Sequence, residues 1–157
     1  MRSDNLRTFF IGLGIVAVQI VLMRHLQILG GESDLVLLYI LWLCKHKTKT
    51  ECLLFAAMLG FLQDAITDLW GLHMFSKALL VFILYGYLNH ITQSRLIFWQ
   101  VFLVILLAAF IHNVIFYGVS MFSELYASGY VGSSLIIVST IFTAVVGSFL
   151  QLVREDI

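Results

Sequence analysis

Three charged residues lie within an otherwise apolar stretch, and their types could support chemistry. The stretch GFLQDAITDLWGLHMFSKALL, residues 60–80, contains Asp64, Asp68 and Lys77. Since an isolated charge is costly in apolar surroundings, we expect Asp64 to pair with Lys77 across two neighbouring helices. Three roles stay open for such a pair: it fixes the register of the helices, lines a site for a ligand or partner, or relays protons.

The same stretch has small residues at helical spacing. Ala56, Gly60, Asp64 and Asp68 recur every fourth residue, so a helix places them on one face. The small end of that face lets another helix approach closely. Gly71 follows where the chain must reverse, and a glycine there permits a positive φ.

A second small-residue face is predicted near the end of the chain. Ser139, Thr143 and Gly147 are also four residues apart. We expect them to form a close-packing surface, either for a helix of this chain or for a partner. The isolated polar residues Gln19, His112 and Asn113 are expected to hydrogen-bond to neighbouring helices.

Known catalytic patterns do not occur in the sequence. It has no serine in a glycine-rich elbow, no HExxH, no phosphate-binding glycine loop and no CxxC. Cys44 and Cys52 have no companions at metal-ligand spacing, so we interpret them as small buried apolar residues. We therefore predict a protein that is not an enzyme and that has neither cofactor nor metal.

The composition is that of an integral membrane protein. Of the 157 residues, 61% are hydrophobic and 11% are charged, and the mean hydropathy is +1.01. A formal net charge of zero gives no indication of nucleic-acid binding. Because only short polar breaks separate the apolar runs, we expect one polytopic membrane domain over residues 1–157. The basic, apolar amino terminus lacks a cleavage pattern, and we expect it to stay as the first helix.

The apolar runs predict an all-α fold with six transmembrane helices. The second run has ten residues and rises only about 15 Å, half of the usual hydrocarbon thickness. The predicted segments are Thr8–Leu29, Leu35–Cys44, Cys52–Leu69, Leu72–Ile91, Leu96–Phe122 and Leu135–Val153.

The distribution of basic residues predicts the orientation. With the amino terminus inside, seven basic residues lie on the cytoplasmic side and only Arg24 lies outside. Both termini are then cytoplasmic, in a bacterial inner membrane. If Lys45, Lys47 and Lys49 mark the inner surface, Asp34 at the other end of the short helix lies below the outer surface. A recessed outer pocket follows, with local bilayer thinning as the alternative. The seven inner residues are Arg2, Arg7, Lys45, Lys47, Lys49, Arg95 and Arg154.

The order of these features resembles MreD, the small membrane subunit of the bacterial rod-shape system, or elongasome. The matching stretches are SDLVLLYILWL, residues 33–43, and residues 60–80 quoted above. The chain has Ser33 where the family commonly has proline, Leu69-Trp70-Gly71 in place of a Pro-Leu-Gly turn, and Lys77 in place of a small or apolar residue.

The resemblance implies a non-enzymatic role in cell-shape control. MreD-like proteins bind MreC and, with MreB, RodA and a class B penicillin-binding protein, support lateral peptidoglycan synthesis. The resemblance also implies a fold similar to the substrate-binding subunits of energy-coupling-factor vitamin transporters, and possible homo-oligomers formed through the partner. The matching family positions are Gly60, Asp64 and Gly71, with Asp34 as a weaker match.

Two other functions stay open at this point. A vitamin importer's binding subunit would use the outer pocket, with Asp34, Asp64, Asp68 and Lys77 nearby. An ion-coupled transporter would depend on the Asp64 carboxylate. The scaffold hypothesis instead expects a partner's transmembrane helix to bind a small-residue face, the lipid bilayer being the other partner.

Overall fold

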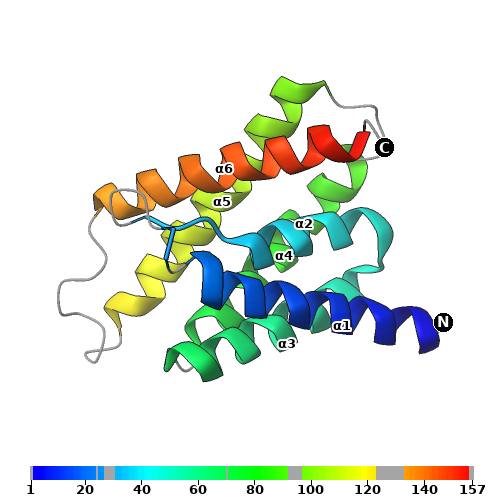
Figure 1. Cartoon of the computed structure of the whole chain (residues 1–157), viewed down its shortest axis with the longest axis horizontal. Helices are drawn as coiled ribbons and strands as arrows, with labels where there is room; N and C mark the ends of the chain where they lie inside the picture. Colours follow the sequence, from blue (N-terminus) through cyan, green and yellow to red (C-terminus); the bar gives the residue numbers. More distant parts are fainter. Residues whose placement is uncertain are drawn as a thin grey trace.

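The structure is a computed structural model of an all-α protein. It describes residues 2–23, 25–26, 31–69, 71–91, 97–122 and 133–155. Figure 1 shows the helices packed as one bundle. In chain order they are α1 (Arg2–Val18) with its π-helical continuation η1 (Gln19–Met23), α2 (Leu35–His46), α3 (Lys49–Thr67), α4 (Leu72–Ile91), α5 (Phe98–Met121) and α6 (Ser133–Glu155).

The predicted all-α membrane fold and the six helical segments are confirmed, whereas the similarity to the substrate-binding subunits of energy-coupling-factor transporters stays a prediction. Among the described residues, five helical segments are long and apolar enough to cross a membrane, and α2 is a shorter apolar helix. With 12 residues, α2 rises only about 18 Å, so it is as short as expected. The predicted segment ends Leu29 and Leu96 lie outside the described residues. So do Arg24 and Arg95, which contributed to the charge count.

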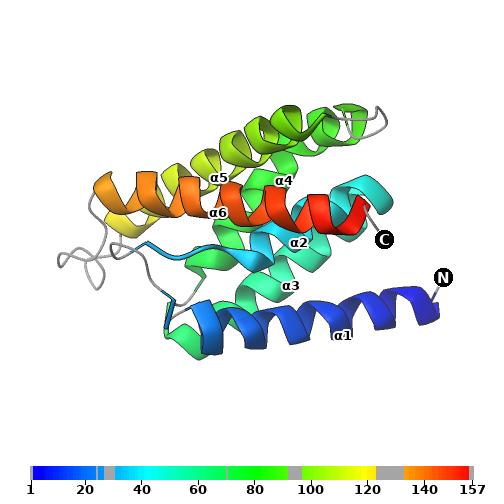
Figure 2. The ribbon, with the colours of Figure 1, turned by 45° about the horizontal axis from the view of Figure 1, so that its top comes forward.

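The short helix α2 is the centre of the bundle. It contacts α1, α3, α4, α5 and α6, and in Figure 2 it lies between α1 and α6. A helix that is apolar on all sides lies either in a protein core or in the hydrocarbon of a membrane, and the contacts of α2 place it in the core of the bundle. Cys44 of α2 and Cys52 of α3 are buried free cysteines, as expected. The buried α2 residues are Val36, Leu37, Tyr39, Ile40, Leu43 and Cys44.

The polar turn between α2 and α3 is tied to the start of α1. Lys47 Nζ donates to Asn5 Oδ1 at 2.6 Å, and Asn5 Nδ2 donates to Glu51 Oε1 at 3.0 Å. Thr48 and Glu51 form a capping box, in which each side chain accepts from the other's backbone N–H, and this begins α3. Figure 1 shows both chain ends on the same side of the bundle as this turn.

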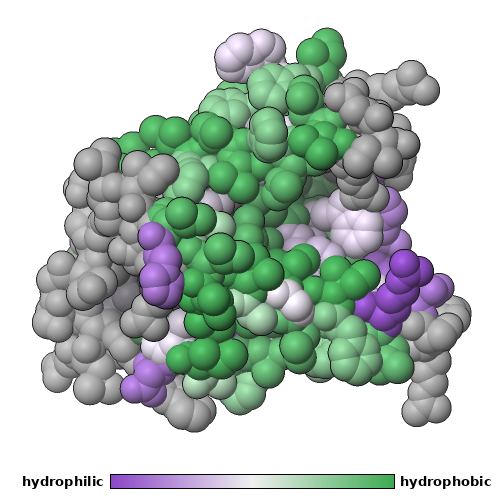
Figure 3. All heavy atoms as spheres, viewed as in Figure 1, coloured by the Kyte–Doolittle hydropathy of each residue, from purple (hydrophilic) through white to green (hydrophobic). Residues whose placement is uncertain are grey.

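The outer surface of the bundle is largely apolar. In the view of Figure 3 hydrophobic residues cover most of the described surface, and hydrophilic residues gather towards its two ends. Large side chains on several helices are strongly exposed, which fits contact with lipid chains. They include Phe10, Phe82, Trp99, Leu103 and Phe149.

Candidate functional site: a buried ionic cluster joining the starts of α2 and α4

An ion pair in the interior of the bundle joins Asp34 to Lys77. The Lys77 Nζ lies 2.7 Å from Asp34 Oδ2, and the Lys77 side chain is fully buried while that of Asp34 is 16% exposed. The prediction that Lys77 pairs with Asp64 is therefore wrong. The direct ion pair of Lys77 is with Asp34, the N-cap residue of α2.

Asp34 has two roles because its two oxygens point in different directions. It is the N-cap of α2, where Oδ1 accepts from the backbone N–H of Leu37 at 2.8 Å. Its Oδ2 faces α4 and accepts from Lys77. An aspartate at an N-cap satisfies an otherwise unpaired N–H group and interacts favourably with the helix dipole. Asp34, which was only a weak match to the family pattern, is thus the centre of the cluster.

Two histidines complete the cluster. His73 Nδ1 lies 3.3 Å from Lys77 Nζ, and His112 Nε2 on α5 lies 4.0 Å from Asp34 Oδ2. Because an ammonium group only donates, His73 Nδ1 must accept, which places the His73 proton on Nε2. Both rings pack against Phe116, with ring centroids 4.7 Å and 6.3 Å from it.

His112 Nε2 is a buried polar atom without a hydrogen-bond partner among the described residues. Its other nitrogen, Nδ1, lies 3.4 Å from Asn113 Oδ1, and Asn113 Nδ2 donates to Thr140 Oγ1 on α6 at 2.9 Å. The expected bond to a neighbouring helix is therefore confirmed for Asn113. It is wrong for His112, whose hydrogen-bond contact is with Asn113 on its own helix.

Asp64 caps the start of α4 and does not neutralise Lys77 directly. Its Oδ1 accepts from the His73 N–H and its Oδ2 from the Met74 N–H, both at 2.9 Å. The first N–H groups of a helix have no partner inside that helix, and an anion there also interacts favourably with the helix dipole. Asp64 is 1% exposed, and these two bonds, together with a backbone hydrogen bond from Gly71, compensate its burial.

Gly60 and Gly71 belong to the same joint between α3 and α4. A Cβ atom on Gly60 would lie 2.6 Å from Met74 Cα and 2.7 Å from Met74 N, so only glycine allows this contact. Gly71 has a φ of +88°, the positive value that was predicted. Asp68 ends α3 in the left-handed conformation, with φ at 59°, and it is exposed.

The small-residue faces are used inside the chain. Thr143 Oγ1 accepts from the Asp34 N–H at 3.1 Å, and Ser139 Oγ accepts from the Glu32 N–H at 3.3 Å. Ala56 is fully buried, and a Cβ on Gly147 would lie 2.5 Å from Leu38 Cδ2. Of the two alternatives left open for the α6 face, packing within the chain is the one observed.

Gln19 has a more specific role than sequence reasoning gave it. Its Nε2 donates to the Ser33 carbonyl at 2.8 Å, and its Oε1 accepts from the Leu35 N–H at 2.7 Å. Gln19 thereby bonds to the backbone on both sides of Asp34, where α2 begins. The π-helical turn of η1 begins at Gln19, and no sequence pattern indicated it.

The arrangement brings three potential ligand atoms together. One atom each from Asp34, His73 and His112 lies within 4.8 Å of the other two. Sequence reasoning missed both histidines as members of this site, because each is an isolated polar residue on a different helix. The recessed outer pocket stays a prediction; at its expected place the described residues form this buried cluster.

Comparisons with known proteins do not add to this description. No protein-family model matches the chain, and neither a curated protein nor a solved structure was found to match it.

Proposed function

We propose that this protein is a non-enzymatic membrane scaffold of the rod-shape system, with the role that MreD has in binding MreC. The proposed location is the bacterial inner membrane, with both termini and the lysine-bearing turn in the cytoplasm. MreB, RodA and a class B penicillin-binding protein are proposed members of the larger assembly. The observation that carries this proposal is the joint between α3 and α4.

That joint contains the three positions on which the family resemblance mainly depends. Gly60 permits backbone contact with the first turn of α4, Asp64 caps that turn, and Gly71 supplies the positive φ before it. Each residue fixes a shape, and none of the three presents a reactive group towards a substrate. Motif residues with purely architectural roles are what a scaffold requires, since its function depends on the surface it presents to a partner.

The proposed partner surface differs from the one expected from sequence. The faces of Ala56–Gly60 and of Ser139, Thr143 and Gly147 are occupied within the chain, so a partner helix has no access to them. We therefore propose that the MreC-like helix binds an outward, lipid-facing surface of the bundle. Large exposed side chains are plentiful there.

Co-purification tests the proposal directly. The tagged protein should capture the MreC-like protein of its own organism from detergent extracts, and its depletion should turn rods into spheres. Gly60→Ile should reduce both functions, because it separates α3 from α4. Gly86→Ile is the matched control, since Gly86 lies on α4 with open space around it. Normal rods after deletion of the gene would refute the proposal.

One observation favours a second candidate, the substrate-binding subunit of a small-molecule importer. Ser33 Oγ and His112 Nε2 are both buried without a hydrogen-bond partner in the described part of the chain, and both belong to the surroundings of Asp34. Unsatisfied polar atoms in a buried site are typical of places that a ligand completes. Native mass spectrometry of the purified protein would detect a retained vitamin-sized molecule, and a ligand-free spectrum would favour the scaffold.

A further inference from the structure

We propose that Asp34, His73 and His112 form a binding site for one divalent transition-metal ion of the Zn²⁺ type, and that Lys77 is a built-in cation that competes for it. This inference does not depend on the proposed scaffold function. It follows from the donor atoms, from the position of the Lys77 ammonium, and from the unpartnered nitrogen of His112.

The donor set suits such an ion. Two imidazole nitrogens and one carboxylate oxygen are a common combination at zinc sites, in which a fourth position is left for water or another donor. The three donor atoms lie within 4.8 Å of one another. Bonds of about 2.0–2.1 Å to a tetrahedral ion require separations of about 3.3 Å. Side-chain movements of about 1 Å therefore bring these residues into coordination range, without a change of backbone.

The site is already organised around a positive charge. Lys77 Nζ lies 2.7 Å from Asp34 Oδ2 and 3.3 Å from His73 Nδ1, so it occupies the space between two of the three donors. A metal ion must displace this ammonium from Asp34.

The His112 ring is oriented for metal binding. Asn113 donates to Thr140 through Nδ2, which turns its Oδ1 towards His112 Nδ1 at 3.4 Å. Nδ1 then carries the proton, and Nε2 has a free lone pair directed at the Asp34 carboxylate 4.0 Å away. A lone pair facing a carboxylate is unfavourable unless a cation lies between them. Histidine ligands of metals are usually held in this way by a hydrogen bond at the other ring nitrogen.

The local charge also favours a second cation. Asp34 and Asp64 supply two carboxylates and Lys77 one ammonium, which leaves one negative charge when both imidazoles are neutral. A bound cation offsets this formal excess of negative charge. Asp34 is 16% exposed, so the site has a route to water at the side of the bundle where α2 begins.

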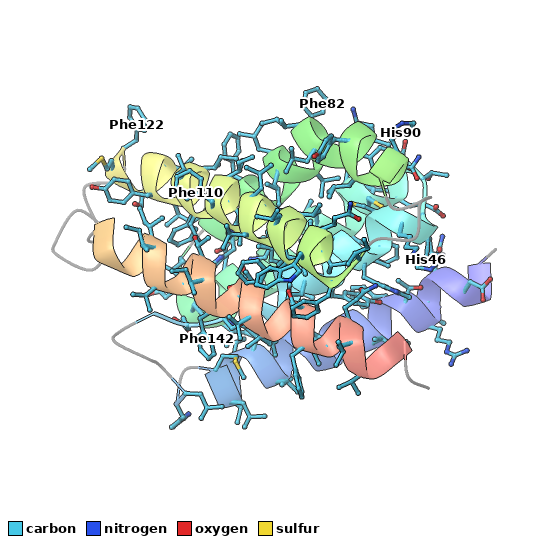
Figure 4. The ribbon with its side chains drawn as sticks, turned by 90° about the horizontal axis from the view of Figure 1, so that it is seen from above. His46, Phe82, His90, Phe110, Phe122 and Phe142 are labelled. Carbon is cyan, nitrogen blue, oxygen red and sulfur yellow. The ribbon has the colours of Figure 1, made fainter. Side chains whose placement is uncertain are left out.

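Cobalt titration of the full chain in detergent tests the site, because Co²⁺ replaces Zn²⁺ and absorbs visible light when it is tetrahedrally coordinated. We expect one Co²⁺ per chain. His112→Gln and His73→Gln should each weaken binding by at least about tenfold, and Lys77→Met should strengthen it by a similar factor. His46→Ala and His90→Ala are the matched controls, since both histidines are exposed and lie together at one end of the view in Figure 4.

A stability measurement separates loss of the site from misfolding. Lys77→Met leaves Asp34 without its cation, and Zn²⁺ should then raise the melting temperature of this variant but not that of Lys77→Met with His112→Gln. The inference is overturned if neither the native chain nor Lys77→Met binds Co²⁺. It is equally overturned if the His46 and His90 controls, and not the cluster variants, abolish binding.

Discussion

Lys77 and Asp34 are 43 positions apart in the sequence, yet the Lys77 ammonium lies 2.7 Å from the Asp34 carboxylate. This ion pair ties the second turn of α4 to the N-cap residue of the central helix α2. Lys77 is fully buried, so its charge has no access to water. The buried charge of Lys77 is stabilised by the Asp34 carboxylate and by the lone pair of His73 Nδ1.

Removal of one partner of this pair should destabilise the protein strongly. Lys77→Met leaves a largely buried carboxylate without its cation, and we expect a loss of about 3–5 kcal/mol in the free energy of unfolding. Equilibrium unfolding in mixed detergent micelles, in the absence of added metal, measures it. The exposed Lys45 provides the matched control, since Lys45→Met should change the free energy of unfolding by less than about 0.5 kcal/mol.

The double variant Asp34→Asn with Lys77→Met identifies the cause of that loss. It removes both charges, while the introduced asparagine can still cap α2. We expect it to recover at least half of the stability lost in Lys77→Met, because an apolar replacement of a buried ion pair is often close to neutral. A double variant as unstable as Lys77→Met would show that packing of the lysine side chain, and not its charge, is what matters.

Asp64→Ala should destabilise the protein more than Asp68→Ala. The first variant deprives the N–H groups of His73 and Met74 of their acceptors, at a cost of about 2 kcal/mol or more. The second variant places alanine at a φ of 59°, which costs about 1 kcal/mol. Thermal unfolding of the two variants side by side provides the comparison, and equal melting temperatures would contradict the capping role.

Much of the fold could be predicted because it depends on local composition. Runs of about 20 apolar residues must form helices in a membrane, and the lysines around Lys47 limit the length of α2. The capping box at Thr48 and Glu51 could also have been recognised, as the sequence Thr-Lys-Thr-Glu has the required spacing.

The pairing of charges could not be predicted in the same way. Asp64 and Lys77 lie at similar distances from the turn that joins their helices, so the sequence favours a contact between them. The first N–H groups of α4, however, have no acceptor inside their own helix and lie in a partly buried place. Asp64 supplies that acceptor. The choice of Asp34 as the partner of Lys77 depends on how α2 packs against α4, which no local pattern contains.

Gly60→Ala should be far more harmful than its size suggests. The added methyl group would lie 2.6 Å from Met74 Cα, and backbone cannot move aside as a flexible side chain does, so we expect a loss of about 1–3 kcal/mol. Gly86→Ala has no atom within 4 Å of the new methyl group and should gain up to about 1 kcal/mol from helix propensity. Measurement of the free energy of unfolding should therefore show a decrease for Gly60→Ala and no decrease for Gly86→Ala.

Thr143→Val should weaken the attachment of α6 to the start of α2. It keeps the shape of the side chain but leaves the Asp34 N–H without its acceptor, which costs about 1–3 kcal/mol. Ser148→Ala is the matched control, because the Ser148 hydroxyl donates to a carbonyl of its own helix. Thr143→Ser should behave like the native chain in unfolding experiments, since it retains the hydroxyl group.

Labelling of single cysteines should establish the proposed orientation. In a chain with Cys44 and Cys52 replaced by alanine, Glu32→Cys and Lys45→Cys introduce thiols at exposed positions before and at the end of α2. A membrane-impermeant maleimide should label Glu32→Cys in intact spheroplasts. It should label Lys45→Cys only after the membrane has been permeabilised.

The reason for this expectation is the cost of lysine in hydrocarbon. Lys45, Lys47 and Lys49 flank the turn between α2 and α3, and each would cost about 2.5–3.5 kcal/mol near the centre of a bilayer. The turn must therefore lie at a water boundary, and the positive-inside rule favours the cytoplasmic one. Because α2 is short, the same boundary places Asp34 below the opposite surface. Labelling of Lys45→Cys from outside would reverse the orientation and place the ionic cluster on the cytoplasmic side.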